Sequence, residues 1–340
     1  MSKSLAVQYR PSDWDEVVEQ DNIKKILQNQ LSSGEVRNSY LFVGGAGTGK
    51  TTCARILAKE INHGTGSAIE IDGASNNGVD QVREINNQAK TRSVDSEYKI
   101  FIIDECHMIT TAGWNAMLKL IEEPPAKTIF IFCTTNPEKI PKTILSRVQR
   151  YDFQRISTEG IYKRLAEICN KENIQAEENA LMHIAKLADG HMRDALTMLD
   201  KAIAYDSTIT ELNITSALGL NSYYDINVLF DAVTQGFEEG IISSVETCHN
   251  EGRELKQLID DEISFVLDYI KWQINHSLQF CSCPSFVEEW FRQCKVSKNH
   301  ATHLLDALID IKNTIKYDSS PKTIIEAMLI LESEKLKGEK

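Results

Sequence analysis

A glycine-rich segment near the N-terminus has the residue types and spacing of a phosphate-binding loop. Residues 44–51 read Gly-Gly-Ala-Gly-Thr-Gly-Lys-Thr and follow the apolar run Tyr40–Val43. Glycines let backbone N–H groups turn inward around phosphate oxygens, a lysine reaches the β- and γ-phosphates, and a threonine hydroxyl binds Mg²⁺. We expect Lys50 and Thr51 to take the last two roles. The rest of the loop is formed by Gly44, Gly45, Ala46, Gly47, Thr48, Gly49 and Thr52.

Two carboxylates follow a second apolar run, Ile100–Ile103. At the carboxyl end of a parallel strand, Asp104 would hold Mg²⁺ through water, and Glu105 would polarise the water that attacks the phosphate. The alternative, a solvated pair of acids on a loop, would leave the phosphate-binding loop without its usual metal-side partner. We interpret the nearby His107 as structural rather than catalytic.

The elements that must position these residues alternate between short apolar strands and amphipathic helices. Such alternation predicts a buried parallel sheet. The expected strands are Tyr40–Val43, Ala68–Ile71, Ile100–Ile103 and Ile129–Cys133, and the helices between them lie near 50–62, 78–91 and 111–123. After Phe153 the pattern becomes helical, first at 158–172, 177–188, 191–205 and 210–218 and then from Asn221 onward. The predicted class is α/β plus all-α, with domains at 1–155, 156–220 and 221–340.

Composition narrows the class of protein. The chain has 340 residues and a net charge of −12, which excludes a highly basic protein that binds nucleic acid by bulk charge, but not a local basic patch. Residues 221–340 hold 20 Asp and Glu against 12 Lys and Arg, so most of the acidic excess lies there. Eight scattered cysteines without a C-x-x-C pair indicate free thiols. The sequence predicts no signal peptide and no membrane span, hence a cytoplasmic protein.

A string of motifs in order resembles one family over about residues 6–220. Besides the two segments above, the motifs are Tyr9-Arg10-Pro11 with Trp14, Val17, Val18 and Gln20; Ala74–Val79; Asp104–Met108; Asn115–Lys119; Glu122–Pro125; Thr134–Pro137; Ile144–Arg147; and Gly190–Leu196. The combination is similar to the gamma/tau subunits of the bacterial DNA polymerase III clamp loader, which are AAA+ ATPases. The resemblance implies an AAA+ nucleotide-binding domain, a small helical lid and a helical collar that assembles a ring.

The resemblance also assigns roles to side chains. Thr135 and Asn136 resemble sensor 1, a position that detects the γ-phosphate. Arg193 resembles sensor 2, which touches the nucleotide of its own subunit, whereas Arg147 resembles the arginine finger, which reaches the neighbouring subunit's site. The adenine-side pocket would be formed by Tyr9, Arg10, Pro11, Val17 and Val18.

The function that the resemblance implies is that of an ATPase motor subunit of a sliding-clamp loader. Such a subunit uses ATP and Mg²⁺, assembles with other loader subunits into a hetero- or homo-oligomeric ring, a pentamer, and places a sliding clamp on primer–template DNA. No membrane partner is expected.

Two departures from the family pattern stand out. The family usually carries a four-cysteine zinc module after the phosphate-loop helix, but residues 62–67 contain no cysteine, and Cys281-x-Cys283 is too tightly spaced to replace it. We therefore expect no zinc. The chain also stops near the end of the family's third domain, which suits a short form, encoded by a bacterium or a phage.

Two other functions remain open at the sequence level. A DExH-type helicase could use the same loop and Asp104-Glu105-Cys106-His107, but it needs a second α/β motor lobe, and everything after Phe153 has a helical pattern. A non-catalytic scaffold subunit of a loader would have eroded motifs, whereas the lysine, both acids and both arginines are present.

Overall fold

The computed structural model describes residues 4–219, 221–318 and 320–338, and it divides into two compact units. The first unit contains residues 1–168 and 188–200, and the second contains residues 169–187 and 201–340. Two helices, α7 (Thr158–Glu172) and α9 (Met192–Tyr205), supply residues to both units. The three-domain division expected from the sequence stays a prediction.

The first unit is built on a five-stranded sheet in the order β2-β3-β4-β1-β5, with every pair parallel. Its strands are β1 (Ser39–Val43), β2 (Ile69–Asp72), β3 (Lys99–Asp104), β4 (Thr128–Thr134) and β5 (Gln149–Asp152). The two central strands β4 and β1 are buried along their whole length, as expected for a sheet covered on both faces. Four strands lie within one residue of the predicted ranges, and β5 is an edge strand that the sequence analysis did not find.

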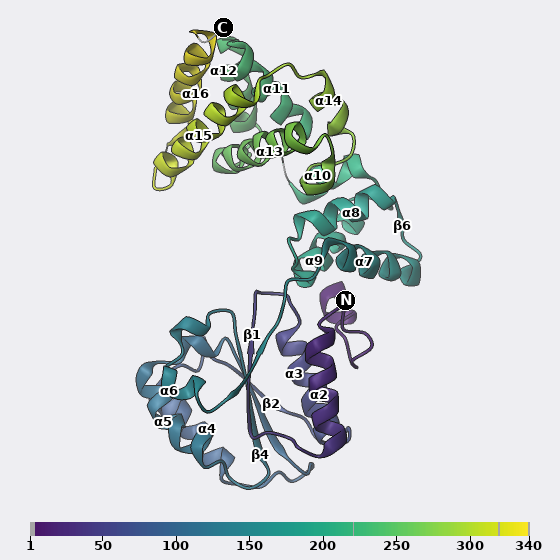
Figure 1. Ribbon diagram of the computed structural model, residues 1–340, viewed down its shortest axis with the longest axis vertical. Helices are drawn as coiled ribbons and strands as arrows, with labels where there is room; N and C mark the ends of the chain where they lie inside the picture. Colours follow the sequence, from purple (N-terminus) through teal and green to yellow (C-terminus); the bar gives the residue numbers. More distant parts are fainter. Residues whose placement is uncertain (1–3, 220, 319, 339–340) are drawn as a thin grey trace. The chain divides into compact units, whose positions relative to one another are not determined.

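Helices cover both faces of this sheet (Figure 1). One face packs against α2 (Asp21–Ser33) and α3 (Lys50–Ile61), and the other against α4 (Val79–Ala89), α5 (Thr111–Glu122) and α6 (Lys142–Leu145). The short elements are α1 (Leu5–Gln8), η1 (Cys106–Met108) and η2 (Pro137–Lys139). Helix α2 was not predicted. Its apolar residues Ile23 and Leu27 point into the core that α3 shares with the sheet.

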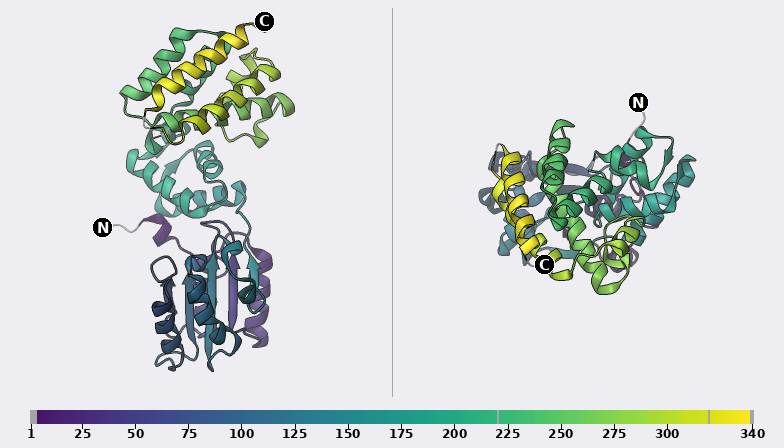
Figure 2. Two further views of the ribbon diagram at one scale, coloured as in Figure 1. Left: turned by 90° about the vertical axis from the view of Figure 1, so that its left-hand side faces the viewer. Right: turned by 90° about the horizontal axis from the view of Figure 1, so that it is seen from above.

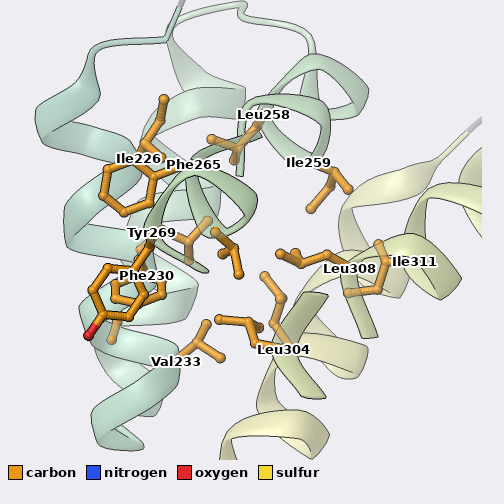
Figure 3. Packing of buried hydrophobic residues seen from close by; sticks show 14 of the residues in the cluster. Ile226, Phe230, Val233, Leu258, Ile259, Phe265, Tyr269, Leu304, Leu308 and Ile311 are labelled. Atoms are coloured by element: carbon orange, nitrogen blue, oxygen red, sulfur yellow. The ribbon is translucent and has the colours of Figure 1, made fainter. Parts of the chain in front are cut away.

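The second unit is helical, and its residues from Tyr223 onward form a bundle around one apolar core. Its helices are α8 (Glu178–Leu187), α10 (Glu211–Leu218), α11 (Tyr223–Gln235), α12 (Glu238–Asn250), α13 (Leu255–Asn275), η3 (Leu278–Phe280), α14 (Val287–Gln293), α15 (Lys298–Ile315) and α16 (Pro321–Gly338). In both views of Figure 2 the yellow α16 lies along neighbouring helices, and it packs against α11, α12 and α15. Figure 3 shows the core, in which rings such as Phe230, Phe265 and Tyr269 meet edge to face.

The helical pattern predicted after Phe153 is confirmed, since α7 to α10 lie within one residue of the expected ranges. The sequence analysis missed one small feature there, the parallel pair β6 (Gln175–Ala176) and β7 (Thr208–Ile209). The α/β plus all-α class is thus the observed one. Among the described residues, no helix combines the length and apolar character that crossing a bilayer requires.

Glu262 is an exception in the apolar core of the bundle. It lies on α13 and is only 2% exposed, and its Oε1 atom accepts a hydrogen bond from no described residue. Burial, with the nearby carboxylates of Asp261 and Asp231, raises the pKa of Glu262 well above its usual value. A group whose pKa is raised by folding contributes stability below its unfolded pKa and loses it as the pH rises toward the folded pKa. Glu262 therefore weakens the bundle at neutral pH.

Replacing this carboxyl by its neutral isostere should stabilise the bundle. We expect Glu262→Gln to raise the free energy of unfolding by about 1–3 kcal/mol at pH 7.5 and by much less at pH 4.5, because there the carboxyl is neutral in the folded state and about half protonated in the unfolded state. Urea denaturation of the full chain, followed by tryptophan fluorescence at both pH values, measures the difference. Glu334→Gln, at an exposed site on α16, is the matched control. An equal effect of the two variants, or no gain at pH 7.5, would contradict the argument.

Candidate nucleotide-binding site

The glycine-rich loop joins the buried strand β1 to helix α3. Gly47 and Gly49 have φ angles of 66° and 99°, in the left-handed region that favours glycine. The Lys50 ammonium donates hydrogen bonds of 2.9 Å and 2.7 Å to the carbonyl oxygens of Gly44 and Gly45. Lys50 is only 6% exposed, and burial lowers its pKa. The loop thus holds a nearly buried cation at its centre, where phosphate oxygens can replace the two carbonyls.

The carboxylate of Asp104 lies directly against this loop. The Thr51 hydroxyl donates a 2.7 Å hydrogen bond to Asp104 Oδ2, and Oδ1 accepts a 2.9 Å bond from the backbone N–H of Glu105. The two oxygens that the sequence assigned to Mg²⁺ therefore come together from different elements, α3 and β3. A hydroxyl and a carboxylate are hard oxygen ligands of the kind that Mg²⁺ takes, alongside substrate phosphates. The donor set fits this ion.

Glu105 is held in an unusual backbone conformation next to Asp104. Its φ is 43°, a left-handed value that is uncommon outside glycine and that often marks functional sites. Its Oε2 atom accepts a 3.1 Å hydrogen bond from the Thr135 hydroxyl and lies 3.2 Å from Nδ1 of His107. His107 Nδ1 is also 3.1 Å from the Thr134 hydroxyl. The end of β4 thus orients the carboxylate at the end of β3.

Asn136 is placed differently from Thr135. Its backbone N–H donates a 3.0 Å hydrogen bond to the Thr134 hydroxyl, but no bond joins its side chain to Glu105 among the described residues. Of the two sensor 1 candidates, Thr135 is therefore the one that the structure joins to the predicted base.

A cavity beside the loop gathers the residues that the sequence placed around the adenine. It is lined by Tyr9, Arg10, Pro11, Val17, Val18, Arg193 and the loop residues 47–52. Burial lowers the pKa of Arg10, and the neighbouring Arg55 and Arg193 guanidinium groups lower it further. This concentration of positive charge suits an anionic ligand. Arg164, whose Nη2 donates to the Tyr9 carbonyl, also lines the cavity, and the sequence analysis did not single it out for this site.

His191 is a second residue that sequence reasoning missed. It precedes α9. A Cβ atom added to Gly47 would lie 3.3 Å from Cα of His191, and a Cβ atom added to Gly45 would lie 3.4 Å from its Nε2. The turn before α9 therefore packs directly on the glycine-rich loop and needs glycine there. The spacing of the motif Gly190–Leu196 offered a signal, because His191 lies two residues before Arg193.

Arg147 lies apart from this group. It follows α6 and lines a polar hollow of about 420 Å³ together with Ser39, the first residue of β1. The glycine-rich loop begins after Val43, at the other end of the same strand. At about 3.3 Å per residue, the strand separates the two places by roughly 13 Å. Arg147 therefore lies at the amino edge of the sheet, opposite the loop, and its expected role at a neighbouring subunit's site stays a prediction.

A separate cluster of possible metal ligands lies in the helical unit. Asp268, Cys281 and Cys283 are buried, and their ligand atoms lie within 4.8 Å of one another. The carboxylate of Asp268 is already engaged, since Oδ2 accepts hydrogen bonds from Ser282 and from the Cys283 backbone, and Oδ1 accepts one from Lys271. These bonds anchor the loop after η3 to α13, which is a structural role.

The fold and the site together define an AAA+ ATPase. RuvB of Thermotoga maritima, a Holliday junction branch migration motor, superposes with a TM-score of 0.54 at 21% sequence identity, covering 66% of this chain and 79% of that chain. A family model for the ATPase lid domain of DNA polymerase III clamp loader subunits matches residues 160–207, and one for the DNA polymerase III delta subunit matches residues 67–157.

Sequence relatives define the family more closely. The chain is 35% identical to DNA polymerase III subunit tau of Bacillus subtilis, over 95% of this chain and 62% of that protein. It is 34% identical to subunit gamma/tau of Mycoplasma genitalium, over 94% of this chain and 51% of that protein. The chain is thus similar to DNA polymerase III gamma/tau subunits over nearly its whole length, and it spans between half and two thirds of the length of these two relatives.

Loss of the loop lysine tests whether this site binds nucleotide. We expect Lys50→Ala to weaken ATP binding by at least about tenfold, because the lysine is the cation that the loop directs at the phosphates. Titration of the purified chain with a fluorescent ATP analogue measures the affinity. Lys59→Ala, at an exposed position near the end of the same helix, should bind normally. If both variants bind the ATP analogue with equal affinity, the assignment of the loop to phosphate binding is wrong.

Metal analysis tests the expectation that the chain needs no zinc. A structural zinc site takes four ligands, whereas the cluster around Cys283 offers three, one of them an oxygen pair already hydrogen-bonded. We expect the purified chain to contain no stoichiometric zinc and Cys283→Ser to leave its metal content unchanged. One equivalent of zinc that disappears in Cys283→Ser would show that the expectation is wrong and would place the metal at this cluster.

Proposed function

We propose that this chain is an ATP-hydrolysing motor subunit of a sliding-clamp loader in DNA replication. The observation that carries the proposal is the 2.7 Å hydrogen bond between Thr51 and Asp104, because it joins the phosphate-binding loop to the strand end that bears the predicted base. A non-catalytic subunit has no need to keep this arrangement. Similarity to gamma/tau subunits supplies the replication context.

In the proposed reaction Lys50 binds the β- and γ-phosphates of ATP in place of the carbonyls that it contacts here. Thr51 and Asp104 would hold Mg²⁺, which neutralises negative charge on the phosphates. Glu105, oriented by Thr135, accepts the proton of the attacking water. Thr135 is close enough to Glu105 to report on the γ-phosphate through the same hydrogen bond. Arg193 binds the nucleotide of its own subunit from the wall of the cavity.

Assembly would complete the site. Arg147 stabilises the phosphoryl charge at the site of a neighbouring subunit, because the length of β1 keeps it from its own loop. We assign residues 1–155 to the nucleotide-binding domain, 156–220 to the lid and 221–340 to a collar that joins the subunits of a pentameric ring. The acidic helical bundle supports the collar assignment, since its exposed faces offer surface for helix-on-helix packing between subunits.

The other partners would be further loader subunits, a sliding clamp and primer–template DNA. ATP binding between subunits holds the clamp open, and entry of DNA stimulates hydrolysis and releases the closed clamp. The amino ends of α4 and α5 are our candidates for DNA contacts. The first turn of α4 has no side-chain cap, whereas in α5 the Thr110 hydroxyl accepts a hydrogen bond from the N–H of Gly113. Such a protein works in the cytoplasm of a bacterium, or of the host cell if a phage encodes it.

Substitution of Arg147 and substitution of Arg193 should affect ATP binding and hydrolysis differently in the isolated chain and in the assembled complex. We expect Arg147→Ala to bind ATP normally as an isolated chain and to lower the DNA- and clamp-stimulated ATPase rate of the complex by about 10³-fold or more, the usual effect of an arginine finger. Arg193→Ala should already weaken ATP binding by the isolated chain. Fluorescent nucleotide titration and steady-state ATPase assays measure both. Impaired ATP binding by isolated Arg147→Ala would refute the assignment to a neighbouring site, and strand separation by the complex would favour the helicase.

Mixed complexes test the same assignment without relying on loss of activity. Glu105→Gln should bind ATP and fail to hydrolyse it, because an amide cannot act as a base. In complexes that contain both Glu105→Gln and Arg147→Ala chains, an intact Glu105 can meet an intact Arg147 at some interfaces. We expect part of the ATPase activity to return there. No recovery in complexes that assemble normally would contradict action between subunits.

A further inference from the structure

The guanidinium of Arg147 is held in one orientation by two hydrogen bonds and one ion pair. Nη1 donates to the Thr143 carbonyl at 2.6 Å and to the Ser146 hydroxyl at 3.1 Å, and both acceptors belong to its own helix and turn. The ion pair joins it to another element, since Nε lies 2.7 Å from Oε1 of Glu122, the last residue of α5. No hydrogen bond of Nη2 is found to any described residue, so this corner of the guanidinium is left for a ligand.

Glu122 stands where helix electrostatics disfavour a carboxylate. The carboxyl end of a helix carries a partial negative charge, which disfavours an acidic side chain there. Glu123 follows directly and adds a second acid. The ion pair with Arg147 offsets this cost. The position of Glu122 is thus explained by its arginine partner and not by the helix that carries it.

Both partners of the ion pair are fixed to the same core. Leu120 and Ile121, next to Glu122, and Ile144, three residues before Arg147, are buried in the cluster between the sheet and α5. Helices α5 and α6 pack on each other within this cluster. The backbone on either side of the ion pair is therefore anchored, and only the side chains can adjust.

The environment of the pair suits an anionic group brought from outside. The hollow around Arg147 is lined by polar residues and by a second cation, Arg37. The side chains of Arg147 and Glu122 are 37% and 45% exposed, and ion pairs this open to water contribute little stability. Such a pair can orient an arginine and still yield it to a phosphate, which binds a guanidinium more strongly.

We propose that Glu122 is a positioning residue for the arginine finger: it presets the guanidinium of Arg147 so that the triphosphate of a neighbouring subunit meets its free corner. This inference rests on the proposed function of Arg147. A free arginine side chain loses much of its rotamer entropy when it is ordered. Because Glu122 orders the side chain in the folded chain beforehand, less of this cost falls on the transition state.

The test uses the assembled complex and the DNA- and clamp-stimulated ATPase. Glu122→Ala should lower kcat by about tenfold without changing KM for ATP, because a mispositioned finger affects the reaction and not nucleotide binding. Glu122→Gln keeps an oxygen acceptor for Nε and should retain more activity than Glu122→Ala. The control is Glu123→Ala, which removes the adjacent acid and should match the wild type.

A double-mutant cycle shows whether Glu122 acts through Arg147. In an Arg147→Ala background, Glu122→Ala should have no further effect on kcat. The inference is wrong if Glu122→Ala behaves like Glu123→Ala, or if it lowers kcat equally with and without Arg147. If Arg147→Ala itself leaves the ATPase of the complex intact, the proposed function fails instead. Should Glu122→Ala prove unstable, the comparison of Glu122→Gln with Glu123→Gln decides in the same way.

Discussion

The parallel direction of the five strands is the constraint on which the site depends. Because every strand runs the same way, the carboxyl ends of β1, β3 and β4 meet at one edge and bring Lys50, Asp104 and Thr135 together from segments far apart in the sequence. The same constraint places the turn before β5, which bears Arg147, at the opposite edge beside Ser39. Under the proposed function, a single sheet carries two half-sites that face away from each other, and stacking one copy or relative on the next completes them.

The sequence was most informative where burial leaves few choices. The central strands are buried along their whole length and almost entirely apolar, so the core of the sheet could be predicted closely. The motif spacing also assigned Thr51 and Asp104 to one site, and the hydrogen bond between them agrees with that assignment. The edge strand β5 reads Gln-Arg-Tyr-Asp and buries only Tyr151, which leaves no apolar run to detect. The pair β6–β7 is shorter still, and a two-residue strand has no periodicity.

Contacts between side chains that are distant in sequence could not be predicted for another reason. Nothing in the composition of residues 190–196 says that His191 packs on Gly47, because that contact depends on where the start of α9 lies in space. The ion pair of Glu122 with Arg147 likewise joins two positions 25 residues apart through the packing of α5 on α6. Motifs identify which residues can do chemistry, and the fold decides which of them meet. The two sensor 1 candidates illustrate this, because among the described residues Thr135 forms a hydrogen bond with Glu105 and the side chain of its neighbour Asn136 does not.

The polar groups of the site are occupied before any ligand arrives, and this is a physical reason for their arrangement. Lys50 is bonded to loop carbonyls, the Thr51 hydroxyl to Asp104, Glu105 to Thr135, and Arg147 to Glu122. A buried polar group without a partner costs about 1–3 kcal/mol, as the orphaned oxygen of Glu262 illustrates in the helical unit. Each internal partner removes that cost in the free chain. The carbonyls that hold Lys50 are neutral and the Glu122 carboxylate beside Arg147 is exposed, so charged phosphate oxygens can displace them. Binding then exchanges one set of hydrogen bonds for a stronger one without first having to build the site.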